Sequence, residues 1–96
     1  MTDNPVVDPT MTPAWEALDG RADAFDPDLR AWFAADPNRA TRWTIDGADL
    51  HVDFSKNLID EDVLADLLAL AEQTGVYDLR DRMFAGEHIN VTEDRA

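Results

Sequence analysis

Cysteine is absent from the 96 residues, and so is any apolar run long enough to cross a membrane. Without cysteine the chain can form no disulfide, no thiolate zinc site and no cysteine nucleophile. The first ten residues also lack the basic start and apolar centre of a secretory signal. We therefore expect a cytoplasmic protein that makes no contact with membranes.

Positive charge is scarce as well. Eight Lys and Arg residues stand against 21 Asp and Glu residues, which gives a net charge of −13. Such a chain repels the phosphates of nucleic acids and anionic lipids, so we expect no nucleic-acid partner. The composition, with 45% hydrophobic and 30% charged residues, is typical of a folded protein. At this length the chain holds one small domain at most.

The first third of the chain predicts an arm followed by two short helices. Residues 1–11 show no periodic apolar pattern and are expected to form a flexible N-terminal arm. Thr12-Pro13 is a helix start, and apolar residues follow at helical spacing over residues 12–25. A second start at Asp26-Pro27 predicts another helix, which Asp36-Pro37 ends.

The pattern then alternates between apolar and polar residues, which predicts one β-hairpin. Its strands are expected at about 42–46 and 49–54, with Asp46-Gly47 as the turn signal. A two-stranded hairpin is only marginally stable in water, so its apolar face needs a cover from elsewhere. The residues expected on that face are Leu50, Val52 and Phe54.

A longer helix should follow the hairpin. Asp60 is a suitable cap, the acidic residues after it favour the positive end of the helix dipole, and Gly75 supplies a left-handed ending. Ile59 and Leu64 have the spacing of a hydrophobic staple. The apolar stripe of this helix would comprise Val63, Leu64, Leu67, Leu68 and Ala71.

The C-terminal third predicts a shorter helix and then the start of another. The shorter helix should run from about Tyr77 to Ala85, end at Gly86 and bury Leu79, Met83 and Phe84. Asn90 to Glu93 has the spacing of a capping box, with Thr92 as a competing cap. Because so short a helix is unstable alone, we expect the chain to be a piece of a longer protein, truncated within a helix. The predicted fold class is thus α+β, mostly helical with one hairpin.

Few residues are candidates for chemistry. His51 and His88 lack any metal-site spacing, and we expect the first to be exposed and the second structural. The acidic run 60–62 lacks the pattern of a calcium loop and is better explained by helix capping. Asp53 could pair with Glu87 or Glu93 for acid–base catalysis only within a shielded cleft. We therefore expect no catalytic residue, no cofactor and no metal in this chain.

The aromatic residues allow two interpretations. They could form a surface on which a ligand stacks, but they fall on faces predicted to be buried and are expected to belong to the core. These residues are Trp15, Phe25, Trp32, Phe33 and Trp43. The glycosylation triplet Asn90-Val91-Thr92 carries little meaning without a secretory signal.

Two motifs carry a resemblance to a known family. The stretch VDFSKN at 52–57 and the segment MFAGEHINVTEDRA at 83–96 closely resemble the N-terminal region of glucose-6-phosphate isomerases. The resemblance runs over residues 12–96, which would be the N-terminal portion of that domain. His88 departs from the family pattern, since many members carry lysine there.

The resemblance implies part of an α/β sugar-isomerase fold and a homodimer that needs no cofactor. The activity it implies is the interconversion of glucose 6-phosphate and fructose 6-phosphate through a cis-enediol, with a glutamate base assisted by histidine and lysine. Those catalytic and phosphate-binding groups lie in family segments beyond Ala96, so the implied partners are the remainder of the chain and a second subunit. The motif positions expected to support the active site and the dimer are Ser55, Lys56, Asn57, Gly86, Glu87, Asn90, Thr92, Glu93 and Arg95. The alternative is an acidic, free-standing interaction domain that binds a basic protein surface.

Overall fold

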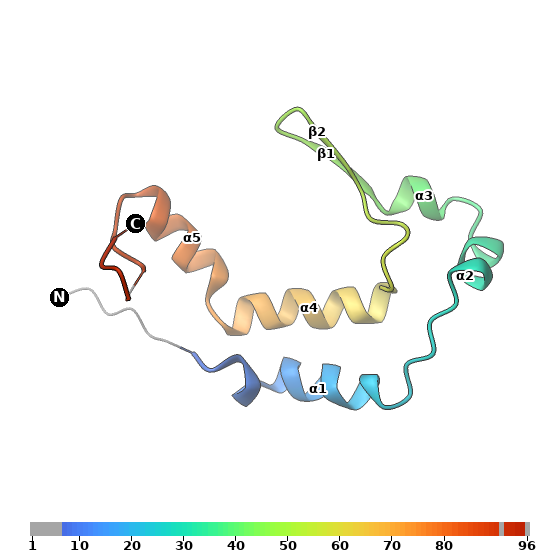
Figure 1. The fold of residues 1–96 in the computed structure, drawn as a ribbon, viewed down its shortest axis with the longest axis horizontal. Helices are drawn as coiled ribbons and strands as arrows, with labels where there is room; N and C mark the ends of the chain where they lie inside the picture. The colour runs from blue at the N-terminus through green and yellow to red at the C-terminus, as the bar shows by residue number, and fades with distance from the viewer. Residues whose placement is uncertain (1–6, 91, 96) are drawn as a thin grey trace. The chain divides into compact units, whose positions relative to one another are not determined.

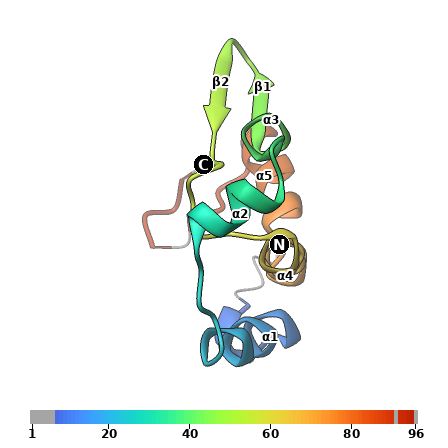
Figure 2. The ribbon, with the colours of Figure 1, turned by 90° about the vertical axis from the view of Figure 1, so that its right-hand side faces the viewer.

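The computed structural model describes residues 7–90 and 92–95, which form two compact units (Figures 1 and 2). The first unit contains the described residues before 25 and after 60, and the second is Phe25–Asp60. In chain order the elements are η1 (Pro9–Met11), α1 (Pro13–Ala22), α2 (Leu29–Ala35), α3 (Arg39–Arg42), β1 (Thr44–Gly47), β2 (Leu50–Asp53), α4 (Glu61–Gln73) and α5 (Val76–Phe84). The predicted fold class, α+β and mostly helical with one hairpin, is confirmed.

The first unit begins with a short 3₁₀ helix, η1, inside the segment predicted as an arm. Asp8 caps it, because its Oδ1 accepts hydrogen bonds from the Thr10 amide at 3.0 Å and the Thr10 hydroxyl at 2.7 Å. Three residues are too few to produce a periodic apolar pattern, so this turn was not predicted. Residues 1–6 of the predicted arm lie outside the described residues.

Helix α1 begins as predicted and ends earlier. The Thr12 hydroxyl accepts a hydrogen bond from the Trp15 amide at 3.2 Å, which confirms the cap. The helix stops at Ala22 rather than near Phe25, and the chain is then non-helical up to Asp28. Pro27 contributes to this early end, since a proline disfavours helical backbone in the residue before it.

Helices α1 and α4 pack side by side within the first unit (Figure 1). Polar contacts tie them near both ends. The Gln73 Oε1 accepts a hydrogen bond from the Ala14 amide at 2.9 Å, and Arg21 forms an ion pair with Asp66. The Gln73 contact satisfies one of the amides that the first turn of a helix leaves without an intrahelical partner. Helix α4 starts directly after Asp60, as predicted, while the staple between Ile59 and Leu64 stays a prediction.

Two left-handed glycines delimit α5, as the sequence predicted. Gly75 has φ of 78° and Gly86 has φ of 84°. The predicted burial of the helix is largely wrong, because Met83 and Phe84 are exposed at 39% and 78% and Leu79 is half-buried. The predicted α4 stripe is also incompletely covered: Leu67 and Leu68 are exposed, whereas Val63, Leu64 and Ala71 are half-buried.

The segment after Gly86 forms a turn where the sequence predicted a helix start. The Asn90 Oδ1 accepts hydrogen bonds from the amides of Thr92 and Glu93, both at 3.2 Å, so Asn90 and not Thr92 acts as the cap. The Asn90 amide then donates to the Arg95 carbonyl at 2.9 Å, which closes a β-bridge. Asp94 adopts a φ of 51°, which is incompatible with a continuing helix. Residues 91 and 96 of the predicted helix lie outside the described residues.

In the second unit, two short helices precede the hairpin. Helix α2 is capped by Asp28, whose Oδ1 accepts from the Ala31 amide at 3.1 Å, and not by Asp26 as predicted. The second short helix, α3, was not predicted, because its four residues lie between a proline corner and the hairpin and show no apolar period. Its importance lies in its first residue, Arg39.

The hairpin is present, but its turn lies two residues later than predicted. Strands β1 and β2 are antiparallel and Gly47 pairs with Leu50, so the turn residues are Ala48 and Asp49 rather than Asp46-Gly47. Ala48 and Asp49 have φ of 49° and 62°. This left-handed pair is typical of a type I′ turn, which normally uses asparagine and glycine, and alanine there is an unusual choice.

We expect replacement of Ala48 by asparagine to stabilise the hairpin. A left-handed conformation costs alanine about 1–2 kcal/mol, and asparagine reduces that cost through local hydrogen bonding. The expected gain is about 0.5–1 kcal/mol, measured as slower amide hydrogen exchange at Ile45 and Val52. Ala48→Val should have the opposite sign, because a β-branched residue tolerates positive φ worst.

The two faces of the hairpin differ in chemistry. Ile45 lies opposite Val52, and Leu50 lies opposite Gly47, so the three apolar side chains share one face. Their exposures are 58% for Ile45, 65% for Leu50 and 48% for Val52. We call these three residues the apolar hairpin face. Phe54, predicted to join that face, is instead half-buried and packs edge-on against Trp43, with ring centroids 5.5 Å apart.

Candidate functional site

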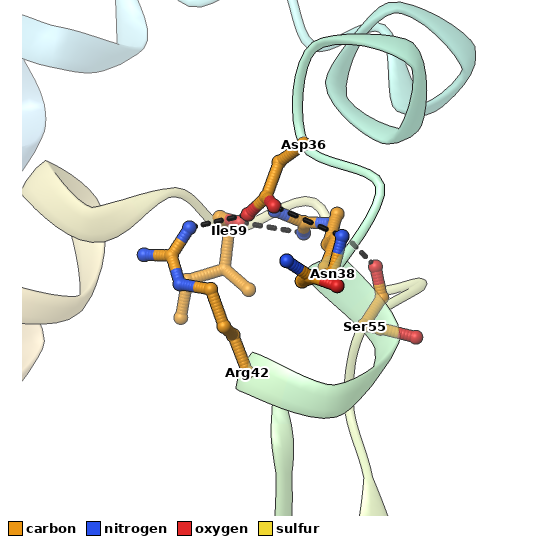
Figure 3. A network of polar contacts seen from close by, with 6 residues as sticks. Asp36, Asn38, Arg42, Ser55 and Ile59 are labelled. Atoms are coloured by element: carbon orange, nitrogen blue, oxygen red, sulfur yellow. Dashed lines mark hydrogen bonds and ion pairs between the residues drawn. The ribbon is translucent and has the colours of Figure 1, made fainter.

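The most organised polar site lies in the second unit, around Arg39. Arg39 is only 4% exposed. Its guanidinium donates hydrogen bonds to main-chain carbonyls of the segment that follows the hairpin. The Nε donates to the Ser55 carbonyl at 2.8 Å, while Nη2 donates to the carbonyls of Ile59 at 2.9 Å and Asn57 at 3.3 Å. Figure 3 shows the hydrogen bonds that reach the carbonyls of Ser55 and Ile59. Arg39 thereby fixes the backbone of the segment 55–59, which contains the Ser-Lys-Asn motif.

Three aromatic rings surround the same guanidinium. The Arg39 Cζ lies 4.8 Å from the Trp32 ring centre, 5.0 Å from that of Trp43 and 5.8 Å from that of Phe33. These distances allow cation–π attraction, which is stronger where the cation has lost its water. Trp32, Phe33 and Trp43 therefore surround an arginine of the same chain.

The prediction that all five aromatic residues are buried is only partly correct. Trp43 is 4% exposed and belongs to the core, and Trp32 and Phe33 are half-buried around Arg39. Trp15 and Phe25 are exposed at 41% and 36%. Phe25 does not lie on a helix face as predicted, because α1 ends at Ala22. Its ring centroid lies 6.3 Å from that of Trp32.

The loop before α3 is held by a second set of polar contacts. Asp36 forms an ion pair with Arg42, and its Oδ1 accepts a hydrogen bond from the Asn38 amide at 3.0 Å (Figure 3). These contacts close the turn that carries the chain from α2 into α3. They therefore set the position from which Arg39 reaches the segment 55–59.

Asp53 lies two residues before the Ser-Lys-Asn motif and is hydrogen-bonded to Ser55. Its Oδ1 accepts a hydrogen bond from the Ser55 amide at 2.9 Å, and Ser55 is only 1% exposed. Hydrogen bonds from the Ser55 hydroxyl and amide lower the pKa of Asp53 below its usual 3.8, and the positive charges of Lys56 and His51 act in the same direction. At neutral pH, Asp53 is thus an anchored carboxylate and a poor proton acceptor.

The stabilising contribution of Asp53 should depend on pH in a defined direction. Because its pKa is lower in the folded chain, the contribution is fully present above the usual value of 3.8 and is lost as the pH falls through the lowered value. We expect the Ser55 amide resonance to stay constant from pH 7 to 5 and to move only below pH 4.

The matched control for this titration is a second carboxylate of the same unit. Asp53→Asn should flatten the acid titration of the Ser55 amide, whereas substitution of the exposed Asp26 by asparagine should leave it unchanged. A Ser55 amide that titrates identically in the Asp53→Asn variant would contradict the proposed anchoring.

A polar pocket of about 390 Å³ lies on the polar side of the hairpin. It is lined by Ala40, Thr41, Thr44, Asp46, His51 and Asp53. His51 is exposed, as predicted, and its Nδ1 lies 2.6 Å from the Asp46 Oδ1 on the opposite strand. Two carboxylates against one histidine make this lining unsuited to a phosphate group.

An apolar groove of about 420 Å³ lies in the first unit. Its lining residues are Val7, Pro9, Leu67, Leu70, Ala71, Thr74, Val76 and Leu79. The Thr74 hydroxyl donates back to the Leu70 carbonyl at 2.8 Å, so it is already engaged within α4. The groove therefore offers an apolar contact surface and no group for catalysis.

The remaining candidate residues make local contacts at the surface. His88 is exposed, and its Nδ1 lies 3.1 Å from the Asp94 Oδ1. Glu87 forms an ion pair with Arg82 at 3.4 Å, and Glu93 forms one with Arg95 at 2.8 Å. The hypothesis that one of these glutamates pairs with Asp53 stays a prediction, since they belong to the other unit.

The described residues contain neither a metal-binding cluster nor a membrane-spanning helix. Among residues 7–90 and 92–95, no group of three His, Asp or Glu side chains could hold a metal ion. In the same part of the chain, no helix has the length and apolar character needed to span a bilayer.

Sequence reasoning missed Arg39, the residue that organises the site. A signal was available, because in a helical segment an arginine and a tryptophan four positions later lie on one face, as Arg39 and Trp43 do. Asp36-Pro37 predicts the end of a helix, and the alternating pattern that follows predicts a strand from about residue 42. The buried arginine was therefore overlooked.

Comparison with known proteins shows which family the chain resembles. A family model described as phosphoglucose isomerase matches residues 53–96, beginning at Asp53. Glucose-6-phosphate isomerase 2 of Streptomyces coelicolor is 55% identical over 88% of this chain and 16% of its own length. The glucose-6-phosphate isomerases of Corynebacterium efficiens and Mycobacterium tuberculosis are 49% and 44% identical, over 93% and 100% of this chain and 16% and 18% of theirs.

The chain thus spans 16–18% of the length of the curated relatives that it matches. Within that span the similarity includes both motifs noted in the sequence, the VDFSKN stretch and most of the segment 83–96. From these matches we conclude that the chain belongs to the phosphoglucose isomerase family.

Proposed function

We propose that these 96 residues act as a scaffold within a glucose-6-phosphate isomerase, the enzyme that interconverts glucose 6-phosphate and fructose 6-phosphate. The observation that carries this proposal is the 55% identity to the Streptomyces coelicolor enzyme over 88% of the chain. The match of residues 53–96 to the phosphoglucose isomerase family model supports the proposal. This match includes the segment 55–59, to which Arg39 donates its hydrogen bonds.

The geometry favours a supporting role over a catalytic one. Asp53 has a lowered pKa and accepts a hydrogen bond from the Ser55 amide, so it is poorly matched to proton transfer near neutral pH. The carboxylates of the polar pocket would repel a sugar phosphate. We infer that the catalytic glutamate, histidine and lysine and the phosphate site belong to the parts of the family chain that have no counterpart here.

The proposal extends to partners and location. We infer that the functional enzyme is a cytoplasmic homodimer without a metal or cofactor, and that residues 12–96 form the N-terminal portion of each subunit. The motif residues Ser55, Lys56 and Asn57 would then support the active site by holding the backbone course set by Arg39.

A complementation assay tests this function. The 96-residue chain alone should show no conversion of fructose 6-phosphate in an assay coupled to glucose-6-phosphate dehydrogenase. Mixed with the part of the Streptomyces coelicolor enzyme that it does not match, it should restore turnover. Conversion by the chain alone, or a bound assembly without turnover, would refute the proposal.

The acidic interaction domain remains the competing interpretation, and the net charge of −13 is the observation behind it. It requires a complex with a basic protein that weakens steeply between low and physiological salt. Family membership favours the isomerase, because it accounts for the motifs as well as for the fold.

A further inference from the structure

We propose that the apolar hairpin face, formed by Ile45, Leu50 and Val52, docks on the part of a phosphoglucose isomerase chain that these 96 residues do not contain. This inference rests on the proposed function and names the surface through which the scaffold would join the rest of the enzyme. The other hairpin face, which lines the polar pocket, would stay in contact with water.

The hairpin has one apolar and one polar face, which is the pattern of a β-ribbon that packs on a core with one side. Its cross-strand pairs place all three apolar side chains on one face, and each is between 48% and 65% exposed. The opposite face carries Thr44, Asp46, His51 and Asp53. Alternation of this kind is typical of strands with one face against a core and one toward solvent, and a two-stranded ribbon is only marginally stable without such a cover.

Charge argues against a second copy of this chain as the cover. Each copy carries −13, and three of its acidic residues, Asp46, Asp49 and Asp53, lie on the hairpin itself. A twofold contact through the apolar face would bring together two chains of the same large negative charge, with Asp49 at the turn of each hairpin, while Asp46 and Asp53 lie on the opposite face. Such a contact is electrostatically unfavourable without a compensating cation.

The length of the relatives favours the rest of the isomerase chain as the partner of the apolar hairpin face. The chain covers 16–18% of its relatives, so more than four fifths of the family chain lies outside it. That remainder must present surfaces to which the matched segment packs in the relatives. Among the described residues of the second unit, the exposed large apolar side chains are the three of the hairpin face together with Phe25 and Leu58. Because only the three on the hairpin share one face, we assign the hairpin as the main contact from that unit.

The test uses the full 96-residue chain and the unmatched remainder of the Streptomyces coelicolor enzyme. Leu50→Thr and Val52→Thr remove apolar surface but keep a residue that favours β-strands. His51→Thr is the matched control, since it makes the same replacement on the polar face of the same strand. Affinity is measured by titration calorimetry, and hairpin formation in the free variants by amide hydrogen exchange.

We expect each apolar-face variant to weaken binding about tenfold, and the double variant about a hundredfold, while His51→Thr changes affinity less than twofold. Free hairpin protection should be similar in all variants. Equal affinity of the double variant and the wild type would overturn the inference, even if turnover is restored. Concentration-dependent dimerisation that Leu50→Thr abolishes would overturn it in favour of a second copy. Loss of turnover with normal binding would contradict the proposed function alone.

Discussion

Replacement of Trp43 by alanine is expected to abolish the ordered structure of the second unit. Trp43 is 4% exposed, packs edge-on against Phe54 and contacts the guanidinium of Arg39. Truncating a buried tryptophan to alanine costs about 3–5 kcal/mol, and a unit with so few buried apolar residues has little stability to lose. The measurement is amide hydrogen exchange across β1 and β2, which should lose its protection.

A second tryptophan provides the control. Trp15 lies on α1, is 41% exposed and belongs to the first unit, so Trp15→Ala should leave hairpin exchange unchanged. The conservative variant Trp43→Phe should cost roughly 1–2 kcal/mol, because it keeps an aromatic contact with Phe54. Normal hairpin protection in Trp43→Ala would show that the core lies elsewhere.

The second large effect is expected at Arg39. Arg39→Met keeps much of the side-chain volume but removes the donors to the Ser55, Asn57 and Ile59 carbonyls. Each hydrogen bond from a charged donor contributes about 1.5–3 kcal/mol, and release of a buried charge offsets part of the loss. We expect a net destabilisation of about 2–4 kcal/mol, measured by the urea dependence of tryptophan fluorescence.

The Arg39→Lys variant distinguishes the effect of the positive charge from that of the planar arrangement of hydrogen-bond donors. Lysine keeps the positive charge near Trp32 and Trp43 but cannot donate in the planar arrangement that reaches three carbonyls at once. It should therefore recover less than half of the loss seen in Arg39→Met. Full recovery would mean that charge alone holds the segment 55–59 in place.

Features governed by neighbouring residues were predictable from sequence. The Thr12 cap, the left-handed Gly75 and Gly86 and the start of α4 after Asp60 depend on hydrogen bonds and dihedral angles within a few residues. The hairpin was predictable for the same reason, since its alternation extends over both strands. Its turn was misplaced because Ala48 adopts a conformation that alanine seldom takes.

Features governed by distant residues were not predictable. Arg39 meets carbonyls up to 20 positions away, and no local pattern announces such a contact. The apolar stripe of α4 and the residues Met83 and Phe84 were expected to be buried because periodicity reports which face is apolar and not what covers it. The helix predicted after Asn90 became a turn because Arg95 closes a bridge back to it.

The way in which Arg39 binds the segment 55–59 has a consequence for which positions of this chain tolerate substitution. The guanidinium recognises the carbonyl oxygens of Ser55, Asn57 and Ile59, and every amino acid, proline included, carries that oxygen. Substitution of residue 57 or 59 by any amino acid that keeps its amide hydrogen therefore leaves these contacts intact, because the amides of Asn57 and Ile59 donate to the carbonyls of Phe54 and Asn57. Substitution of Arg39 removes all three contacts at once. In a collection of variants, substitutions should be tolerated more often at positions 57 and 59 than at Arg39.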